Sequence, residues 1–204
     1  MILGWIPSCG LYVVGILILG ITFRNYLKKN NKSTQNNWMS VLEQEHAAQF
    51  VRSKPLEEKL FINIDFTLFP HVKEPTCQDQ YLALMHYAQS PMINLKNESN
   101  LVLKSTYGPQ IVEEVACYEK NYLDCMNTAI FYAECLLQQG YLKEAQITLE
   151  TCIHYHCDIS KCYLLLIDLY KQQSNLQGLT QLKQIATIEM QHSPFLNKVL
   201  YAFQ

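Results

Sequence analysis

The segment from Cys152 to Cys162 holds the residue types best able to bind a metal ion. Cysteine and histidine are zinc ligands, and the segment offers four of them in Cys152, His156, Cys157 and Cys162. On a helix Cys152 and His156 would share a face, whereas His154 would point away. The paired CxxC or HxxxH knuckles of structural zinc sites are missing. We therefore interpret the segment as buried thiols and surface histidines, and predict neither a metal site nor a cofactor.

The rest of the sequence offers no catalytic constellation. Glu45-His46 lacks the His-Glu-x-x-His spacing of a zinc-dependent hydrolase helix. Asp65 stands between apolar residues, where a capping or solvent-facing carboxylate is more frequent than a catalytic one. There is no phosphate-binding loop, no GxSxG motif and no glycine-rich dinucleotide turn. We therefore predict that the chain is not an enzyme, and the sequence identifies no small-molecule substrate.

Residues 1–23 are predicted to form a transmembrane anchor. The stretch from Ile2 to Phe23 carries no charge, and 22 helical residues span roughly 33 Å, enough for a hydrocarbon core of about 30 Å. A cleaved signal peptide would need a positive charge before the apolar run and a small-x-small site after it. Both are missing, and Arg24-Asn25 follows the run directly. An uncleaved anchor is therefore the preferred interpretation.

A basic, polar linker at 24–37 sets the expected orientation. It contains Arg24, Lys28, Lys29 and Lys32 but no acid, whereas no basic residue precedes the apolar run. Basic residues favour the cytoplasmic side of a membrane, so we expect a single-pass protein with its soluble domain in the cytoplasm. The whole chain has a net charge of −2, so its remainder is acidic. An acidic domain is not typical of a nucleic-acid-binding protein.

Seven of the eight cysteines follow the anchor. They are Cys77, Cys117, Cys125, Cys135, Cys152, Cys157 and Cys162. Their number is odd and they are scattered through apolar, periodic segments, which is typical of reduced core thiols and not of a disulfide framework.

Behind the linker, the chain is predicted to be all-α. Residues 38–108 are expected to be mixed, with short helices near 38–50, 78–89 and 99–106 and an extended segment at 60–66. Residues 109–204 have a strong helical periodicity, with apolar stripes over 111–122 and 129–137 and on four later helices. Gly140 falls where a helix C-terminus favours a left-handed residue.

Two windows of 34 residues, 126–159 and 160–193, repeat this pattern. In the first, small residues at Ala133 and Ala145 flank the turn at Gly140, with large residues beside them. These positions resemble the tetratricopeptide repeat, which implies antiparallel helix hairpins. The second window matches only partly. Its turn is Ser174-Asn175, and Leu179 stands where the repeat usually has a small residue. The layout of anchor, basic linker and helical repeats resembles small bacterial membrane proteins.

The resemblance implies a scaffold or adaptor that binds a protein or peptide in a groove lined by the first helix of each hairpin. The expected groove residues alternate with the packing positions; they are Asn127, Phe131, Glu134, Gln138, Lys161, Leu165 and Asp168. Their polar and acidic character favours a polar or basic peptide. The alternative function is a metal-binding or redox-responsive protein that uses Cys152, His156, Cys157 and Cys162.

Overall fold

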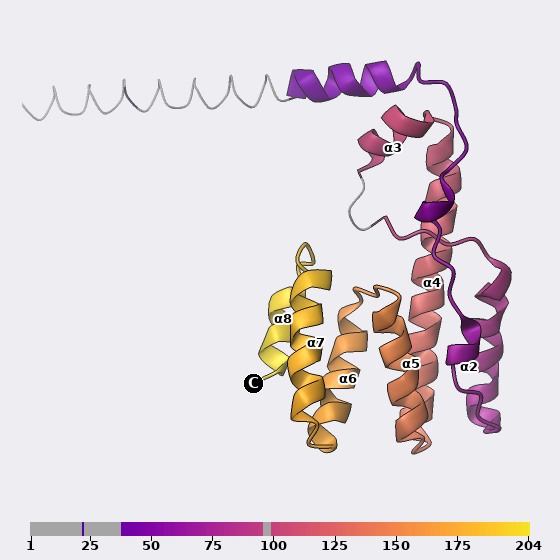
Figure 1. Cartoon of the computed structure of the whole chain (residues 1–204), viewed down its shortest axis with the longest axis vertical. Helices are drawn as coiled ribbons and strands as arrows, with labels where there is room; N and C mark the ends of the chain where they lie inside the picture. Colours follow the sequence, from indigo (N-terminus) through magenta and orange to yellow (C-terminus); the bar gives the residue numbers. More distant parts are fainter. Residues whose placement is uncertain (1–21, 23–37, 96–98) are drawn as a thin grey trace, which may run out of the picture. The chain divides into compact units, whose positions relative to one another are not determined.

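A computed structural model of the chain describes residues 22, 38–95 and 99–204 (Figure 1). The predicted anchor, apart from Thr22, and the predicted linker lie outside these residues. Among the described residues, no helix is both long enough and apolar enough to cross a membrane. The chain divides into two compact units, Met1–Lys54 with Ser99–Ile111, and Pro55–Glu98 with Val112–Gln204.

The first unit, where described, is built from a helix at residues 38–48 and α3 (Asn100–Tyr107). The Ser99 side chain caps α3 by accepting a hydrogen bond of 3.2 Å from the Val102 amide. Lys104 of α3 forms an ion pair of 3.0 Å with Glu45. The Lys54 amide donates a hydrogen bond of 3.0 Å to the Tyr107 carbonyl. Side-chain and backbone contacts therefore join the two segments of this unit.

The second unit is helical throughout its regular elements, which confirms the all-α prediction for the described residues. Its helices are α2 (Pro75–Met85), η3 (His86–Gln89), α4 (Ile111–Gln138, which starts in the first unit), α5 (Leu142–His154), α6 (Ser160–Gln172), α7 (Leu176–Glu189) and α8 (Leu196–Ala202). Figure 1 shows α5, α6, α7 and α8 side by side. The two stripes at 111–122 and 129–137 belong to one continuous helix, because no glycine or proline interrupts residues 123–128.

Of the segment predicted to be extended, 60–66, residues 61–65 lie between two short 3₁₀ helices, η1 (Glu58–Leu60) and η2 (Phe66–Leu68), which include its two ends. Phe61 forms an isolated antiparallel bridge with Ile93, and the Ile62 amide donates to the Met92 carbonyl over 2.9 Å. Without a further strand, this pairing does not develop into a sheet in the described part of the chain.

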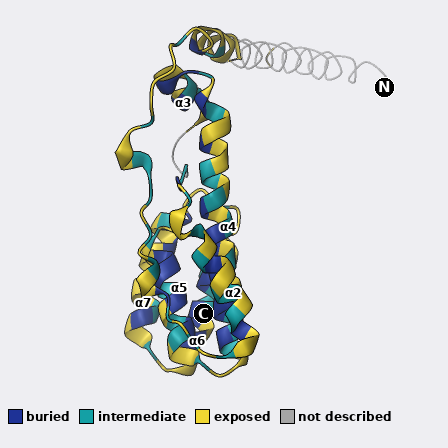
Figure 2. Cartoon of the chain, turned by 90° about the vertical axis from the view of Figure 1, so that its right-hand side faces the viewer, coloured by how far each residue is buried: buried dark blue, intermediate teal, exposed yellow. Residues whose placement is uncertain are grey.

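The core of the second unit is formed by the small and large packing residues of its helices. Ala133 and Ala145, the small residues that flank the first turn, are fully buried. Figure 2 shows buried residues along α2, α4 and α5. Tyr122 and Tyr163 are also buried, and their hydroxyls donate hydrogen bonds of 2.9 Å to the carbonyls of Tyr155 and Cys157. Both tyrosines therefore hold the turn between α5 and α6, while they satisfy their own polar groups.

The turns after α4, α5 and α6 share one hydrogen-bond pattern. In each, a residue with positive φ follows the helix: Gly140 at 82°, His156 at 64° and Ser174 at 54°. After α4, the Tyr141 amide donates to Leu136 over 2.9 Å and the Gly140 amide to Leu137 over 3.1 Å. This is the Schellman motif, and the same spacing recurs at the other two turns. The prediction of a left-handed Gly140 is confirmed, and Ser174 adopts the same conformation without glycine.

We expect Ser174→Gly to raise the free energy of unfolding by about 1 kcal/mol, because a left-handed backbone is unfavourable for any residue with a Cβ. Gly140→Ala should lower it by about 1–2 kcal/mol for the same reason. A Cβ at Gly140 would meet no atom within 4 Å, so its effect reports on the backbone alone. Urea unfolding of the two variants measures both values, and changes of the same sign would contradict the prediction.

Candidate partner-binding groove

A hollow of about 710 Å³ lies between α2 and the C-terminal half of α4. It is lined by Thr76, Asp79, Gln80, Ala83, Thr128, Phe131, Glu134, Cys135, Gln138 and Gln139. We call it the α2/α4 groove. Its size is in the range of ligand pockets. Most of its lining residues are of polar type, with one large aromatic side chain, Phe131, which is 56% exposed.

Three residues that the sequence predicted for partner binding line this groove. They are Phe131, Glu134 and Gln138 on α4. A fourth, Lys161 on α6, places its ammonium nitrogen 2.7 Å from a Glu134 carboxylate oxygen and 4.8 Å from the centre of the Phe131 ring. Lys161 therefore neutralises Glu134 and stacks on Phe131 at the same time. The structure brings these four side chains together.

The other three predicted residues do not line the groove. The Asn127 side chain is exposed, and its amide donates a hydrogen bond of 2.9 Å to the Leu123 carbonyl. Leu165 is half-buried and packs against the core, and Asp168 is exposed farther along α6. Both belong to the same helix as Lys161 but follow it by one and two turns.

The α2 wall of the groove was not predicted. Asp79, Gln80 and Ala83 contribute to it, and Asp79 adds a negative charge. The Oε1 atom of Gln80 is buried and has no hydrogen-bond partner among the described residues. A buried amide oxygen without a donor is unfavourable, and a bound molecule could donate to it only if the Gln80 side chain turned toward the groove. The sequence indicated a helix at 78–89, but not which helix it would face.

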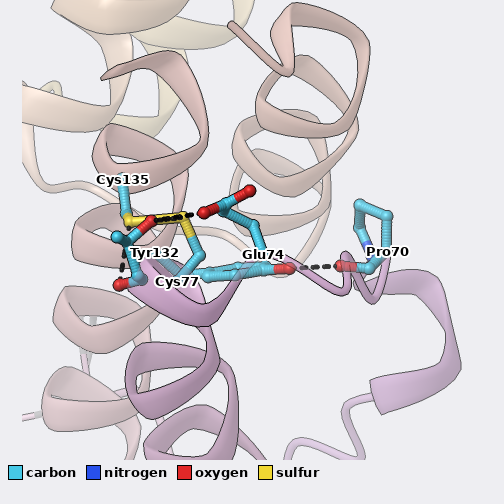
Figure 3. The surroundings of a disulfide bond; sticks show 6 residues. Pro70, Glu74, Cys77, Tyr132 and Cys135 are labelled. Atoms are coloured by element: carbon cyan, nitrogen blue, oxygen red, sulfur yellow. Dashed lines mark hydrogen bonds between the residues drawn. A yellow bond between two sulfur atoms is a disulfide. The ribbon is translucent and has the colours of Figure 1, made fainter. Parts of the chain in front are cut away.

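A disulfide between Cys77 and Cys135 joins the two walls (Figure 3). The Cα atoms are 5.7 Å apart, although 58 residues separate the cysteines in sequence. Nearby, the Tyr132 hydroxyl donates a hydrogen bond of 2.6 Å to the Pro70 carbonyl. The prediction that every cysteine behind the anchor is a reduced thiol is therefore wrong for this pair. The error arises because spacing alone could not show that α2 and α4 lie against each other.

The Cys/His segment is arranged as the preferred interpretation expected. Cys152, Cys157 and Cys162 are buried free thiols. Hydrogen bonds with Cys152 and Cys157, together with burial, raise the pKa of Cys162 well above its usual range. The His156 ring turns outward, with Nδ1 3.1 Å from a Glu189 carboxylate oxygen. In the described ranges, no three His, Cys, Asp or Glu side chains are grouped to hold a metal ion.

The free thiols should differ sharply in reactivity. Burial raises the pKa of Cys125 to about 12, and Cys162 is shifted in the same direction, so both stay protonated and inaccessible near neutral pH. Cys117 is exposed. We expect a maleimide to modify Cys117 in the folded protein at least about tenfold faster than these buried thiols. Peptide mapping after timed labelling measures the rates, and equal labelling would contradict the burial.

Asp65 has the capping role that the sequence favoured. Its carboxylate accepts hydrogen bonds from the Thr67 hydroxyl at 2.6 Å and the Thr67 amide at 2.9 Å. These bonds lower the pKa of Asp65, and the carboxylate caps η2. The Asp65 amide donates a bond of 2.9 Å to the Tyr155 hydroxyl, which attaches this segment to the end of α5.

Comparison of the chain with protein-family models, curated proteins and solved structures gives no significant match. The groove geometry and the sequence pattern therefore carry the functional argument.

Proposed function

We propose that the chain is a membrane-anchored, non-enzymatic adaptor that binds an extended segment of a protein partner in the α2/α4 groove. The observation that carries the proposal is the groove lining, in which exposed Phe131 shares the hollow with the carboxylates of Asp79 and Glu134 and with the Gln80 side chain. An aromatic anchor beside polar groups is typical of peptide recognition.

The partner segment should be polar and carry a basic residue next to an apolar one. Lys161 already neutralises Glu134, so Asp79 supplies the charge available to a basic side chain. Phe131 offers the apolar contact, and Gln80 could accept a backbone or side-chain N–H once its side chain turns toward the groove. The hairpins α4/α5 and α6/α7 support a tetratricopeptide-like arrangement, in which such segments bind along first-helix side chains.

The same proposal places the chain in a membrane through residues 1–23, with the groove on the cytoplasmic side. The support is the uncharged run followed by four basic residues at 24–37. A cytoplasmic groove would meet the exposed basic segments of cytoplasmic proteins or of the short cytoplasmic loops of membrane proteins. The partner is thus a protein, and nucleic acid is not expected.

Site-specific photocrosslinking in cells tests the groove. A photoreactive amino acid at Phe131 should crosslink a partner, whereas one at Ile147 should not. Ile147 is a matched control because it is also an exposed apolar residue, but it lies on α5 and does not line the groove. Equal crosslinking from both positions would contradict the proposal.

Charge reversal makes the test specific. Asp79→Lys should weaken binding of a basic segment from the crosslinked partner by about fivefold or more, because it turns attraction into repulsion at the groove wall. Asp168→Lys is the matched control, since Asp168 is an exposed acid outside the groove. Fluorescence anisotropy with the labelled peptide measures both affinities, and equal losses would contradict the role of the α2 wall.

A second candidate function is redox-responsive binding, which the place of the Cys77–Cys135 disulfide on the groove wall favours. In this hypothesis the redox-active residues are Cys77 and Cys135. The sequence had instead suggested Cys152, His156, Cys157 and Cys162. A cellular dithiol would attack one sulfur, break the S–S bond and become a disulfide itself, leaving two protonated cysteine thiols. Peptide affinity should then differ at least about threefold between the oxidised and reduced protein. Equal affinities would contradict it.

A further inference from the structure

The helix at residues 38–48 has an uncovered apolar face. Trp38 is 65% exposed, Met39 52% and Leu42 58%, and Phe50 in the turn that follows is 77% exposed. At 100° per residue, positions 38, 39, 42 and 46 fall on one side of the helix. The His46 ring lies 5.1 Å from the Phe50 ring and continues the same face. We call these five residues the Trp38 face.

The flank of the helix next to Trp38 is already occupied. Ala48 is buried, and Glu45 forms its ion pair of 3.0 Å with Lys104 of α3. A small residue and an ion pair therefore fix the helix along that flank, and its large apolar side chains are exposed beside it. Large apolar side chains in contact with water are unfavourable, and a group of them marks a surface that another phase or molecule covers.

The position of this helix in the sequence identifies what covers it. The linker 24–37 joins it to the predicted anchor, and 14 residues span at most about 50 Å in any conformation. The helix is thus restricted to the neighbourhood of the bilayer surface. Tryptophan prefers the membrane interface, and a helix with an aromatic and aliphatic face binds in its plane. The basic residues of the linker would meet anionic headgroups on the way.

We propose that the Trp38 face lies in the headgroup region of the bilayer, as an interfacial helix directly after the anchor. The inference rests on the membrane anchoring proposed above and adds a second contact with the lipid. Through the ion pair of Glu45 with Lys104 and the hydrogen bond from Lys54 to Tyr107, the first unit would be held at the membrane surface as one body.

Fluorescence quenching by brominated lipids in vesicles tests the proposal on the full chain. The chain contains two tryptophans, so a Trp5→Phe background leaves Trp38 as the sole emitter. We expect lipids brominated near the headgroup to quench Trp38 emission by about half or more, and lipids brominated at the chain end to quench it less. A combined variant, Met39→Ser, Leu42→Ser and Phe50→Ser, should lose most of this quenching.

The matched control carries Leu176→Ser and Ile188→Ser, which replace exposed apolar residues of α7, and it should retain the quenching. Vesicle flotation distinguishes failure of the membrane anchor from failure of the interfacial helix. A chain that does not float contradicts the anchor, and the interfacial helix with it. Two outcomes in a chain that floats would overturn only the interfacial helix. In the first, Trp38 emits as it does in water. In the second, Trp38 is shielded from aqueous quenchers but is not quenched by the brominated lipids. The shielded case would assign the face to a protein.

Discussion

Reduction of the Cys77–Cys135 disulfide is expected to lower the free energy of unfolding by about 2–4 kcal/mol. The bond closes a loop of 58 residues, which contains all of α3 and most of α2 and α4. A link across so long a loop removes many conformations from the unfolded chain, and its loss restores them. The apolar core to which buried Leu84 of α2 belongs remains after reduction. The helices should therefore persist in the reduced protein, with a lower unfolding midpoint.

Urea unfolding of the full chain in mild detergent, with and without a phosphine reductant, measures this difference. Comparison of the oxidised with the reduced wild type avoids placing serine at the buried Cys77 position. Cys117→Ser is the matched control, because Cys117 is an exposed free thiol and its loss should change stability by less than about 0.5 kcal/mol. Identical curves for the oxidised and reduced protein would show that the bond does not stabilise the fold.

The helices of the second unit could be predicted because each one has its own apolar period and turn. The bounds of α5, α6 and α7 follow the predicted stripes, since the chain reverses at residues able to adopt a left-handed backbone. Ser174 shows the limit of this reasoning. Its side chain gave no sign of a positive φ, yet the hydrogen bonds of the turn impose one. The prediction gave α4 as two stripes, although buried Cys125 and Met126 continue its apolar face between 122 and 129.

The groove could be predicted only on the side that belongs to the repeating helices. Phe131, Glu134 and Gln138 alternate with packing positions on α4, so local periodicity found them. The opposite wall depends on α2, which is separated from α4 by 25 residues with weak periodicity. Pairing of distant helices depends on the shape of the whole core, and no local pattern in Cys77 or Gln80 carries that information. The disulfide was missed for the same reason.

Alkaline unfolding is the second large effect that we expect. Burial raises the pKa of Tyr122 and of Tyr163 far above the usual value for tyrosine, and raises the pKa of Cys125 to about 12. Above about pH 10 these tyrosines would lose their protons in the unfolded chain but keep them in the folded one. The unfolded state then binds fewer protons, so stability is complete below about pH 9 and falls as pH rises. Each tyrosine contributes a loss of about 1.4 kcal/mol per pH unit.

The two tyrosines together would remove about 3 kcal/mol per pH unit, which is large against a total stability of about 5–15 kcal/mol. We therefore expect cooperative unfolding between about pH 10 and 12, with loss of helix at the pH where the last tyrosines, the buried ones, ionise. Tyr163→Phe should make the fall less steep by about one proton, whereas Tyr201→Phe, which alters an exposed ring, should leave it unchanged. Because both buried hydroxyls donate to carbonyls of the α5–α6 turn, their ionisation and the opening of that turn must coincide. Complete ionisation of the 13 tyrosines while circular dichroism still reports intact helices would contradict this coupling.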